Sequence, residues 1–209
     1  MASICSDSKK HQSMIHTKPM MHKANAHKAF TTLLGSIVAW FILTSCATTG
    51  NRAFTITEAP ESIRRNIVFY ARQYAERETA FMMSGRPFLE RNGLLMIDCS
   101  GLIHRVCQYA VNGTRYSLLF SEATVFTLYA NFTSSVDKPE PGDFIFMGER
   151  NPPVHMAIFI YEDDDHFYFI DATLKGAEGI YPAVDGVTMR FYPKDDPRFL
   201  SFARLLVQY

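Results

Sequence analysis

The sequence predicts an α+β domain in which helices come first and an antiparallel sheet follows. Between residues 60 and 130 the apolar residues recur at helical spacing. After residue 138, short apolar and aromatic runs alternate with turn residues, as in strands. Helices followed by strands, without strict alternation of the two, are typical of α+β folds. Hydrophobic residues form 47% of the 209 residues, which is enough for a globular core.

The charge balance argues against one class of protein. Lys and Arg together number 21, as do Asp and Glu, so the formal net charge is zero. A dedicated nucleic-acid binder would carry a basic excess, so we expect no nucleic-acid partner. The balance hides an asymmetry, because residues 1–45 contain five lysines and a single acid, Asp7.

The basic segment has the pattern of a secretory leader. Its lysines precede an apolar run, Phe30–Leu43, which has the length of a signal-peptide core and is short for a bilayer span. The run ends in Leu43-Thr44-Ser45-Cys46, which resembles the bacterial lipobox. The resemblance implies cleavage before Cys46 and lipidation of its thiol. The alternative is an uncleaved anchor with a coincidental cysteine.

These features predict three segments. Residues 1–45 are expected to form a lipoprotein signal peptide, residues 46–57 a tether after the lipidated cysteine, and residues 58–209 the folded domain. The expected location is the bacterial cell envelope, outside the cytoplasm, with the membrane as a partner through the N-terminal lipid.

Three helices are expected in the first half of the domain. The first begins at Pro60 and ends by Ser84-Gly85-Arg86-Pro87. The second begins at Cys99 and stops at Asn112-Gly113. The third covers about 121–129. The apolar positions that predict them are Ile63, Ile67, Tyr70, Ala71 and Tyr74, then Leu102, Ile103, Val106 and Ala110, then Val125, Leu128 and Tyr129.

Strands are expected in the second half. Apolar runs at 144–147, 155–161, 166–171, 187–192 and 202–207 predict a sheet, in which the second and third runs form a hairpin. The acidic residues 162–165 form its turn. We interpret them as a solvated tip, because no glycine or distal glutamate completes a calcium loop. No metal and no cofactor are expected.

The segment Asp98-Cys99-Ser100-Gly101 is the most informative for chemistry. Backbone N–H groups at a helix start favour an anion, so the pKa of the Cys99 thiol is expected to fall below its usual value of about 8.5. His155, at the start of a strand, could act as the base for this nucleophile. Asp171 could accept the second ring N–H. The alternative for Cys99 is a buried structural thiol, which is the role expected of Cys107.

Hairpin geometry favours Asp171 over His166 as the third residue. His166 lies beside the acidic turn, about 17 Å from His155 at the far end of the partner strand. Asp171 returns to the level of His155. Both share a face only if the loop has an odd length or a bulge restores the phase.

These residues resemble the NlpC-type cell-wall peptidases, bacterial members of the papain-like cysteine peptidase superfamily. The resemblance covers roughly residues 60–175. The segments that carry it are Asp98-Cys99-Ser100-Gly101-Leu102, Pro141-Gly142-Asp143-Phe144-Ile145-Phe146, Val154-His155-Met156-Ala157-Ile158-Phe159-Ile160 and Phe169-Ile170-Asp171-Ala172-Thr173.

The resemblance implies a papain-like fold and a cysteine peptidase. The substrate would be the stem peptides of peptidoglycan, cut at an amide bond that often joins D-glutamate to a diamino acid. Cys99 would be the nucleophile, His155 the base and then the acid, and Asp171 the orienting residue. Asp98, Ser100 and Phe88 are candidates for substrate contacts.

Two departures from the family pattern stand out. Phe88 occupies the place of a usual tyrosine, so a hydroxyl is missing upstream of the cysteine. Asp171 replaces the more frequent histidine, although aspartate also orients imidazole in other triads. The first departure supports an alternative function, a catalytically silent lipoprotein that binds cell-wall peptides or a partner through the same groove.

Overall fold

The computed structural model describes residues 54–83, 89–174 and 185–209. The predicted leader, Cys46 and Phe88 lie outside these ranges. No helix within them is long and apolar enough to cross a membrane.

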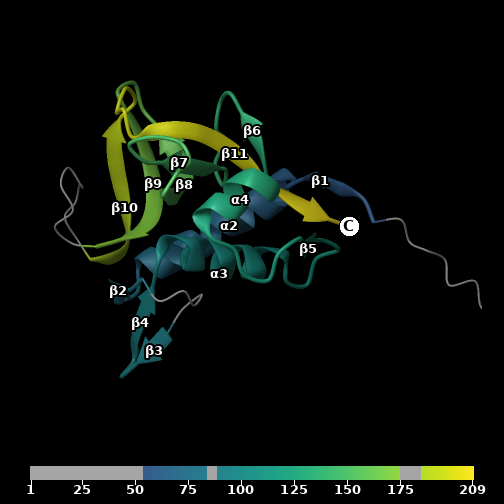
Figure 1. Ribbon diagram of the computed structural model, residues 1–209. Helices are drawn as coiled ribbons and strands as arrows, with labels where there is room; N and C mark the ends of the chain where they lie inside the picture. Colours follow the sequence, from purple (N-terminus) through teal and green to yellow (C-terminus); the bar gives the residue numbers. More distant parts are fainter. Residues whose placement is uncertain (1–53, 84–88, 175–184) are drawn as a thin grey trace, which may run out of the picture. The chain divides into compact units, whose positions relative to one another are not determined.

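The described chain is a mixed α+β structure, as predicted. Its helices α2 and α3 lie side by side below a curved sheet (Figure 1). The helices are α2 (Glu61–Ala75), α3 (Cys99–Val111) and α4 (Val125–Asn131). The sheet order is β1 (Ile56–Glu58), β11 (Phe199–Gln208), β7 (Phe144–Met147), β8 (His155–Glu162), β9 (His166–Thr173) and β10 (Gly186–Pro193), all antiparallel.

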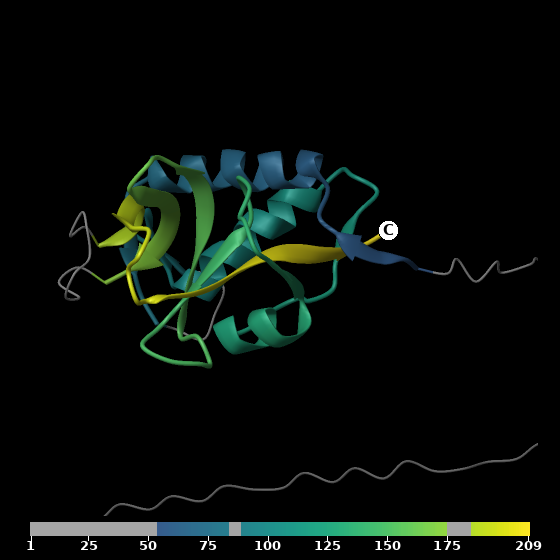
Figure 2. The same cartoon turned by 90° about the horizontal axis from the view of Figure 1, so that it is seen from above.

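The remaining strands are short. Strands β5 (Ser117–Leu118) and β6 (Thr133–Val136) pair with β11, the longest described strand, which runs to the C-terminus (Figure 2). A separate small sheet has the order β2 (Thr79–Phe81), β4 (Leu94–Ile97) and β3 (Leu89–Arg91). Its β2–β4 pair is parallel. Strand β4 leads directly into α3 and therefore positions the start of that helix.

The structure corrects three boundaries. The first helix ends at Ala75, well before the predicted stop, because the chain then turns into β2 and pairs with β4. The third helix begins at Val125 instead of near residue 121, because the Thr124 hydroxyl accepts a hydrogen bond from the Thr127 N–H. Residues 56 and 57, assigned to the tether, belong to β1 and pair with β11.

Both faces of the central strands are buried. One apolar cluster lies between the helices and the sheet, and a second lies on the opposite side of the same strands. Along β8 the side chains alternate between the clusters, with Met156 and Ile158 in the first and Ala157 and Phe159 in the second. Burial on both faces explains why β7, β8 and β9 read as nearly continuous apolar runs in the sequence.

The Pro141-Gly142-Asp143 turn has a packing role. Gly142 has a φ of +90°, and a Cβ there would lie 2.4 Å from the Arg64 carbonyl oxygen in α2. Only glycine therefore fits this close approach of turn and helix. Asp143, with no exposed surface, accepts two hydrogen bonds from Arg204 of β11, each 2.9 Å long. The turn thus ties β7 to α2 and β11.

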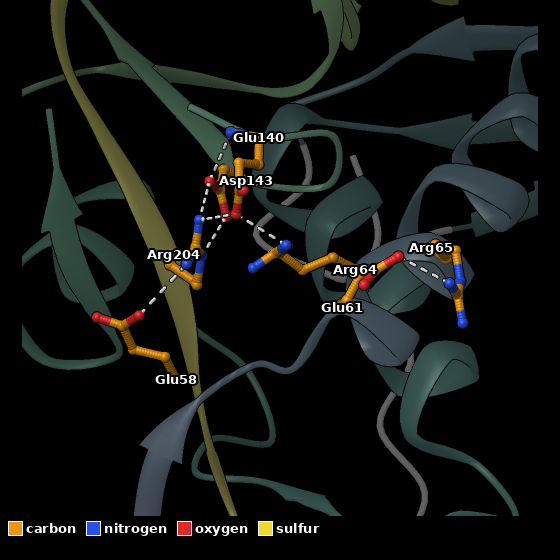
Figure 3. Close-up of polar contacts among 7 residues, drawn as sticks. All are labelled: Glu58, Glu61, Arg64, Arg65, Glu140, Asp143 and Arg204. Atoms are coloured by element: carbon orange, nitrogen blue, oxygen red, sulfur yellow. Dashed lines mark hydrogen bonds and ion pairs between the residues drawn. The ribbon is translucent and has the colours of Figure 1, made fainter. Parts of the chain in front are cut away.

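A wider ion cluster surrounds this pair (Figure 3). Glu140 accepts from Arg204 at 2.6 Å and pairs with Arg64 at 2.8 Å, whereas Glu58 reaches Arg204 only at 3.4 Å. The Glu58 side chain is 46% exposed, so solvent screens its contribution.

We predict that Asp143→Ala lowers the free energy of unfolding by about 3–5 kcal/mol, because it leaves the Arg204 guanidinium without its buried bidentate partner. Glu58→Gln, the matched control on the same arginine, should cost less than about 1 kcal/mol. Chemical denaturation monitored by circular dichroism measures both. Similar losses for the two variants would contradict the assignment.

Candidate active site

Cys99 is the first residue of α3, as predicted, and its side chain is largely buried. Asp98 caps this helix: its carboxylate accepts the Gly101 N–H at 2.7 Å and the Ser100 hydroxyl at 3.1 Å. The cap fixes the direction in which Cys99 leaves the helix start. Asp98 and Ser100 are thus hydrogen-bonded to each other. Their contact with a substrate stays a prediction.

His155 begins β8 and lies next to both proposed partners. Its Nε2 is 2.7 Å from Oδ2 of Asp171, and the ring also hydrogen-bonds the side chain of Cys99. Because Asp171 occupies Nε2, the ring nitrogen left for the cysteine is Nδ1. The His155 side chain is 25% exposed, whereas Asp171 is almost completely buried. The three residues expected to form a site are therefore brought together.

A bulge in the β8–β9 hairpin makes this contact possible. Near the turn, Tyr161 pairs with Tyr168, but past Ile160 the register has moved by one residue. Without that shift Asp171 would point to the opposite face from His155, since a one-residue slip reverses every side chain. Of the two solutions that the sequence left open, odd loop or bulge, the structure uses the bulge.

His166 lies at the other end of the hairpin. Its Nδ1 is 3.5 Å from Asp163, and its ring packs edge-on against Phe191 of β10. Asp163 also accepts the Tyr168 hydroxyl and the backbone N–H groups of residues 165 and 166, which lower the pKa of Asp163 to about 2. The acidic turn is thus held by local hydrogen bonds within the hairpin.

Sequence reasoning missed Arg190. This residue lies within β10 with no exposed surface, and its Nε donates to Oδ1 of Asp171 at 2.6 Å. The signal was a cation in the middle of a strand whose neighbours are apolar, Met189 and Phe191. A buried charge of this kind needs a partner of opposite sign, so its position indicated a buried acidic partner without identifying it.

The environment of His155 favours the protonated ring. Burial by itself would lower the pKa of His155, but hydrogen bonds with Asp171 and Cys99 and their negative charges outweigh it and raise this pKa to about 10. The ring is therefore an imidazolium at neutral pH. A cysteine sulfur in contact with a histidine ring is the nucleophile–base arrangement of covalent catalysis.

Cys107 contrasts with Cys99. It is fully buried on the same helix, and burial raises the pKa of its thiol far above the ordinary value. Both Cys99 and Cys107 are free thiols. The surroundings of Cys107 are those of an inert core residue.

A cysteine at a helix start, hydrogen-bonded to a histidine on an antiparallel sheet, is the arrangement of papain-like cysteine hydrolases. The model of the NlpC/P60 family matches residues 81–185, half of the chain. The chain belongs to the NlpC/P60 family, whose members are generally cysteine hydrolases that act on peptidoglycan. The resemblance and fold class predicted from the sequence are confirmed.

Solved structures with a partial likeness include two proteins. The NlpC/p60 domain of the peptidoglycan hydrolase SagA has 22% identity and a TM-score of 0.38, covering 68% of this chain and 97% of that one. Ly7917 with the hydrolysing product of MDP has 12% identity and a TM-score of 0.43, covering 68% of this chain. The chain spans 62% of the length of Ly7917. No curated protein matches in sequence.

We predict that Cys99 and Cys107 differ sharply in native-state reactivity. Cys99 lies beside the His155 imidazolium at the site, whereas Cys107 is enclosed by the core, so an alkylating reagent at neutral pH should modify only the first of this pair. Peptide mapping by mass spectrometry measures each thiol separately. Labelling at equal rates would contradict the assignment, and labelling after denaturation provides the control for reagent access.

Proposed function

We propose that this protein is a lipid-anchored cysteine peptidase that hydrolyses an amide bond in the stem peptides of peptidoglycan. The observation that supports it best is the position of the His155 ring, with Asp171 on Nε2 and Cys99 as its other partner. Family membership supports the polymer as substrate. The bond between D-glutamate and a diamino acid is the proposed cleavage point.

The proposed reaction follows from the three side chains. The Cys99 sulfur attacks the carbonyl carbon of the scissile amide, and the proton that left the thiol rests on His155. As the carbon–nitrogen bond breaks, His155 donates this proton to the departing amine, which leaves a thioester. Water then attacks the thioester with His155 as base, and the sulfur leaves as thiolate. Asp171 keeps Nε2 protonated and the ring oriented.

Backbone groups at the start of α3 would stabilise the oxyanion. The Gly101 N–H is taken by the Asp98 carboxylate and the Leu102 N–H by the Asp98 carbonyl oxygen. The N–H groups of Cys99 and Ser100 have no partner within a helix, because the first turn lacks preceding carbonyls. We propose that they donate to the negative oxygen that develops on the substrate carbonyl.

The second candidate function is a silent lipoprotein that uses the same groove for binding only. Phe88 favours it, because the family usually has a tyrosine there. Phe88 lies outside the described residues. The presence of Cys99, His155 and Asp171 together favours the enzyme over this alternative.

The proposed location is the bacterial cell envelope. The leader 1–45, the lipid on Cys46 and the tether that follows would hold the domain against a membrane, next to the polymer. Lipid attachment of this kind limits the reach of the enzyme to peptidoglycan near that surface.

We predict that the protein releases stem-peptide fragments from peptidoglycan and that Cys99→Ala releases none, because the variant lacks the nucleophile. Liquid chromatography with mass spectrometry identifies the products and hence the bond. Unchanged circular dichroism of the variant controls for folding. An active Cys99→Ala variant would refute the nucleophile, and a folded wild-type chain that binds fragments without cleaving them would favour the silent lipoprotein.

We predict that substitutions of Asp171 and His166, both in the hairpin, differ in their effect on kcat. Asp171→Asn should lower kcat by about 10²-fold or more, because an amide can present its N–H group to the ring and disfavours the required tautomer. His166→Ala should be nearly neutral, because this ring contacts Asp163 and Phe191 at the turn. Steady-state kinetics with a soluble peptidoglycan fragment as the substrate distinguish the two variants. Exchanged phenotypes would overturn the assignment of Asp171.

We predict that Cys46 carries acyl chains and that the leader is absent from the mature protein. The intact mass of protein extracted from membranes should exceed that of residues 46–209 by a lipid adduct. Cys46→Ala should remove the adduct. An unmodified chain that still begins upstream of residue 46 would contradict the lipoprotein proposal.

A further inference from the structure

Among the described residues, Arg190 is the largest side chain that is fully buried. A guanidinium stays protonated under all ordinary conditions, so β10 carries a permanent positive charge into the interior. Such a charge is tolerated only when it is paired and hydrogen-bonded. The structure provides the partner directly, since Arg190 Nε donates to Oδ1 of Asp171 at 2.6 Å.

The two oxygens of Asp171 have separate partners. Oδ1 receives the Arg190 N–H and Oδ2 lies 2.7 Å from His155 Nε2. Strand β9 lies between β8 and β10 in the sheet, so the carboxylate is held from both sides. A carboxylate fixed through one oxygen cannot rotate freely, which sets the direction of the other oxygen toward the imidazole.

We propose that Arg190 is a positioning residue that acts through Asp171, holding its carboxylate through Oδ1 so that Oδ2 is aimed at the His155 ring. The proposal rests on the proposed function, since it makes Arg190 the fourth member of the series Arg190, Asp171, His155 and Cys99. Arg190 lies beyond residue 185, where the family match ends. It therefore belongs to a part of this chain that the match does not cover.

The other titratable neighbours do not supply this charge. Around Asp171 the described residues include His155 on β8, Tyr192 on β10 and, by way of the histidine, Cys99 on α3. Tyr192 is neutral at pH 7, as a phenol is at its ordinary pKa of about 10. Burial and the negative charge of Asp171 raise the pKa of its hydroxyl further. Among the described residues, Arg190 is thus the permanent cation that hydrogen-bonds this carboxylate.

The geometry favours arginine over lysine. While Nε reaches Asp171, Nη2 of the same planar group donates to the Gly186 carbonyl oxygen at 3.4 Å. Gly186 is itself closely packed, because a Cβ there would lie 2.4 Å from the Thr79 carbonyl oxygen. A lysine ammonium would keep the charge but lose the fixed direction of the guanidinium.

Loss of the cation should change the ionisation of the site. Without the guanidinium, Oδ1 of Asp171 loses its partner at 2.6 Å, and the carboxylate can turn away from the ring. A weaker hydrogen bond between Asp171 and His155 would stabilise the imidazolium less, so the pKa of His155 should fall from about 10 toward its ordinary value. The pH range in which Cys99 exists beside a protonated ring would become narrower.

The test uses the whole 209-residue chain with histidine labelled by ¹³C at Cε1. The His155 signal, identified by its absence in His155→Gln, is titrated by NMR in the wild type and in Arg190→Gln, Arg190→Lys, Asp171→Asn and the double variant Arg190→Gln/Asp171→Asn. The pH dependence of Cys99 alkylation is measured in parallel. Arg204→Gln is the matched control, because it breaks a different arginine–aspartate pair, with Asp143.

We expect Arg190→Gln and Asp171→Asn each to lower the pKa of His155 by about one pH unit or more, and Arg190→Lys by less. The double variant should match Asp171→Asn alone, since Arg190 acts only through that carboxylate. Arg204→Gln should lower the melting temperature and leave the His155 titration unchanged. If Arg190→Gln fails to fold, the lysine variant still tests the proposal through a smaller shift in the same direction.

Two results would overturn the proposal. The first is an unchanged His155 titration in both arginine variants, with only a loss of stability like that of Arg204→Gln. The second is additive shifts in the double variant. Neither readout requires a substrate, so the two proposals fail independently. A protein without peptidase activity would refute the proposed function alone. An active enzyme whose His155 titration does not respond to the Arg190 substitutions would refute this inference alone.

Discussion

The buried carboxylate of Asp171 is the group on which the rest of the site depends. It is 1% exposed, and a charge in that position is stable only when strong partners replace the lost water. One partner is a histidine on the preceding strand and the other an arginine on the following strand. The order β8-β9-β10 is therefore a requirement of the site, because the carboxylate must lie on the middle strand.

The register of these strands matters as much as their order. The bulge at Ile160 brings His155 and Asp171 to one face, and β10 continues in regular pairing with β9 so that Arg190 can reach the same carboxylate. Helix α3 then adds the cysteine from a different part of the chain. The Asp98 cap and strand β4 fix the start of α3. The turn at residues 140–143 ties α2 to the sheet, because Glu140 and Gly142 contact Arg64 of α2 and Asp143 pairs with Arg204 of β11.

Long amphipathic or apolar segments were predictable because their pattern is set by local periodicity. This holds for α2 and α3, for β7 to β10, and for the start of α3 at Cys99. The short strands β1, β5 and β6 were not predictable, since their residues are held mainly by pairing with the distant β11. The parallel β2–β4 pair was missed for the same reason, and it is what ends α2 early.

The candidate site shows the same division. Cys99, His155 and Asp171 could be found from residue type, spacing and family resemblance. The sequence also showed that His155 and Asp171 share a face of the hairpin only with a loop of odd length or a bulge, and the bulge is what the structure has. Arg190 could not be assigned a partner from the sequence, because its contact with Asp171 depends on the pairing of β9 with β10. An isolated cation in an apolar strand indicates a buried partner without identifying it.

The central claim is that Asp171 and Cys99 hold the His155 ring in its protonated form. The most direct measurement is the pair of ¹⁵N chemical shifts of the His155 ring nitrogens in the wild-type protein at pH 7. With a pKa of about 10, both nitrogens should have the shifts of an imidazolium. A neutral ring, with one nitrogen unprotonated at this pH, would contradict the account.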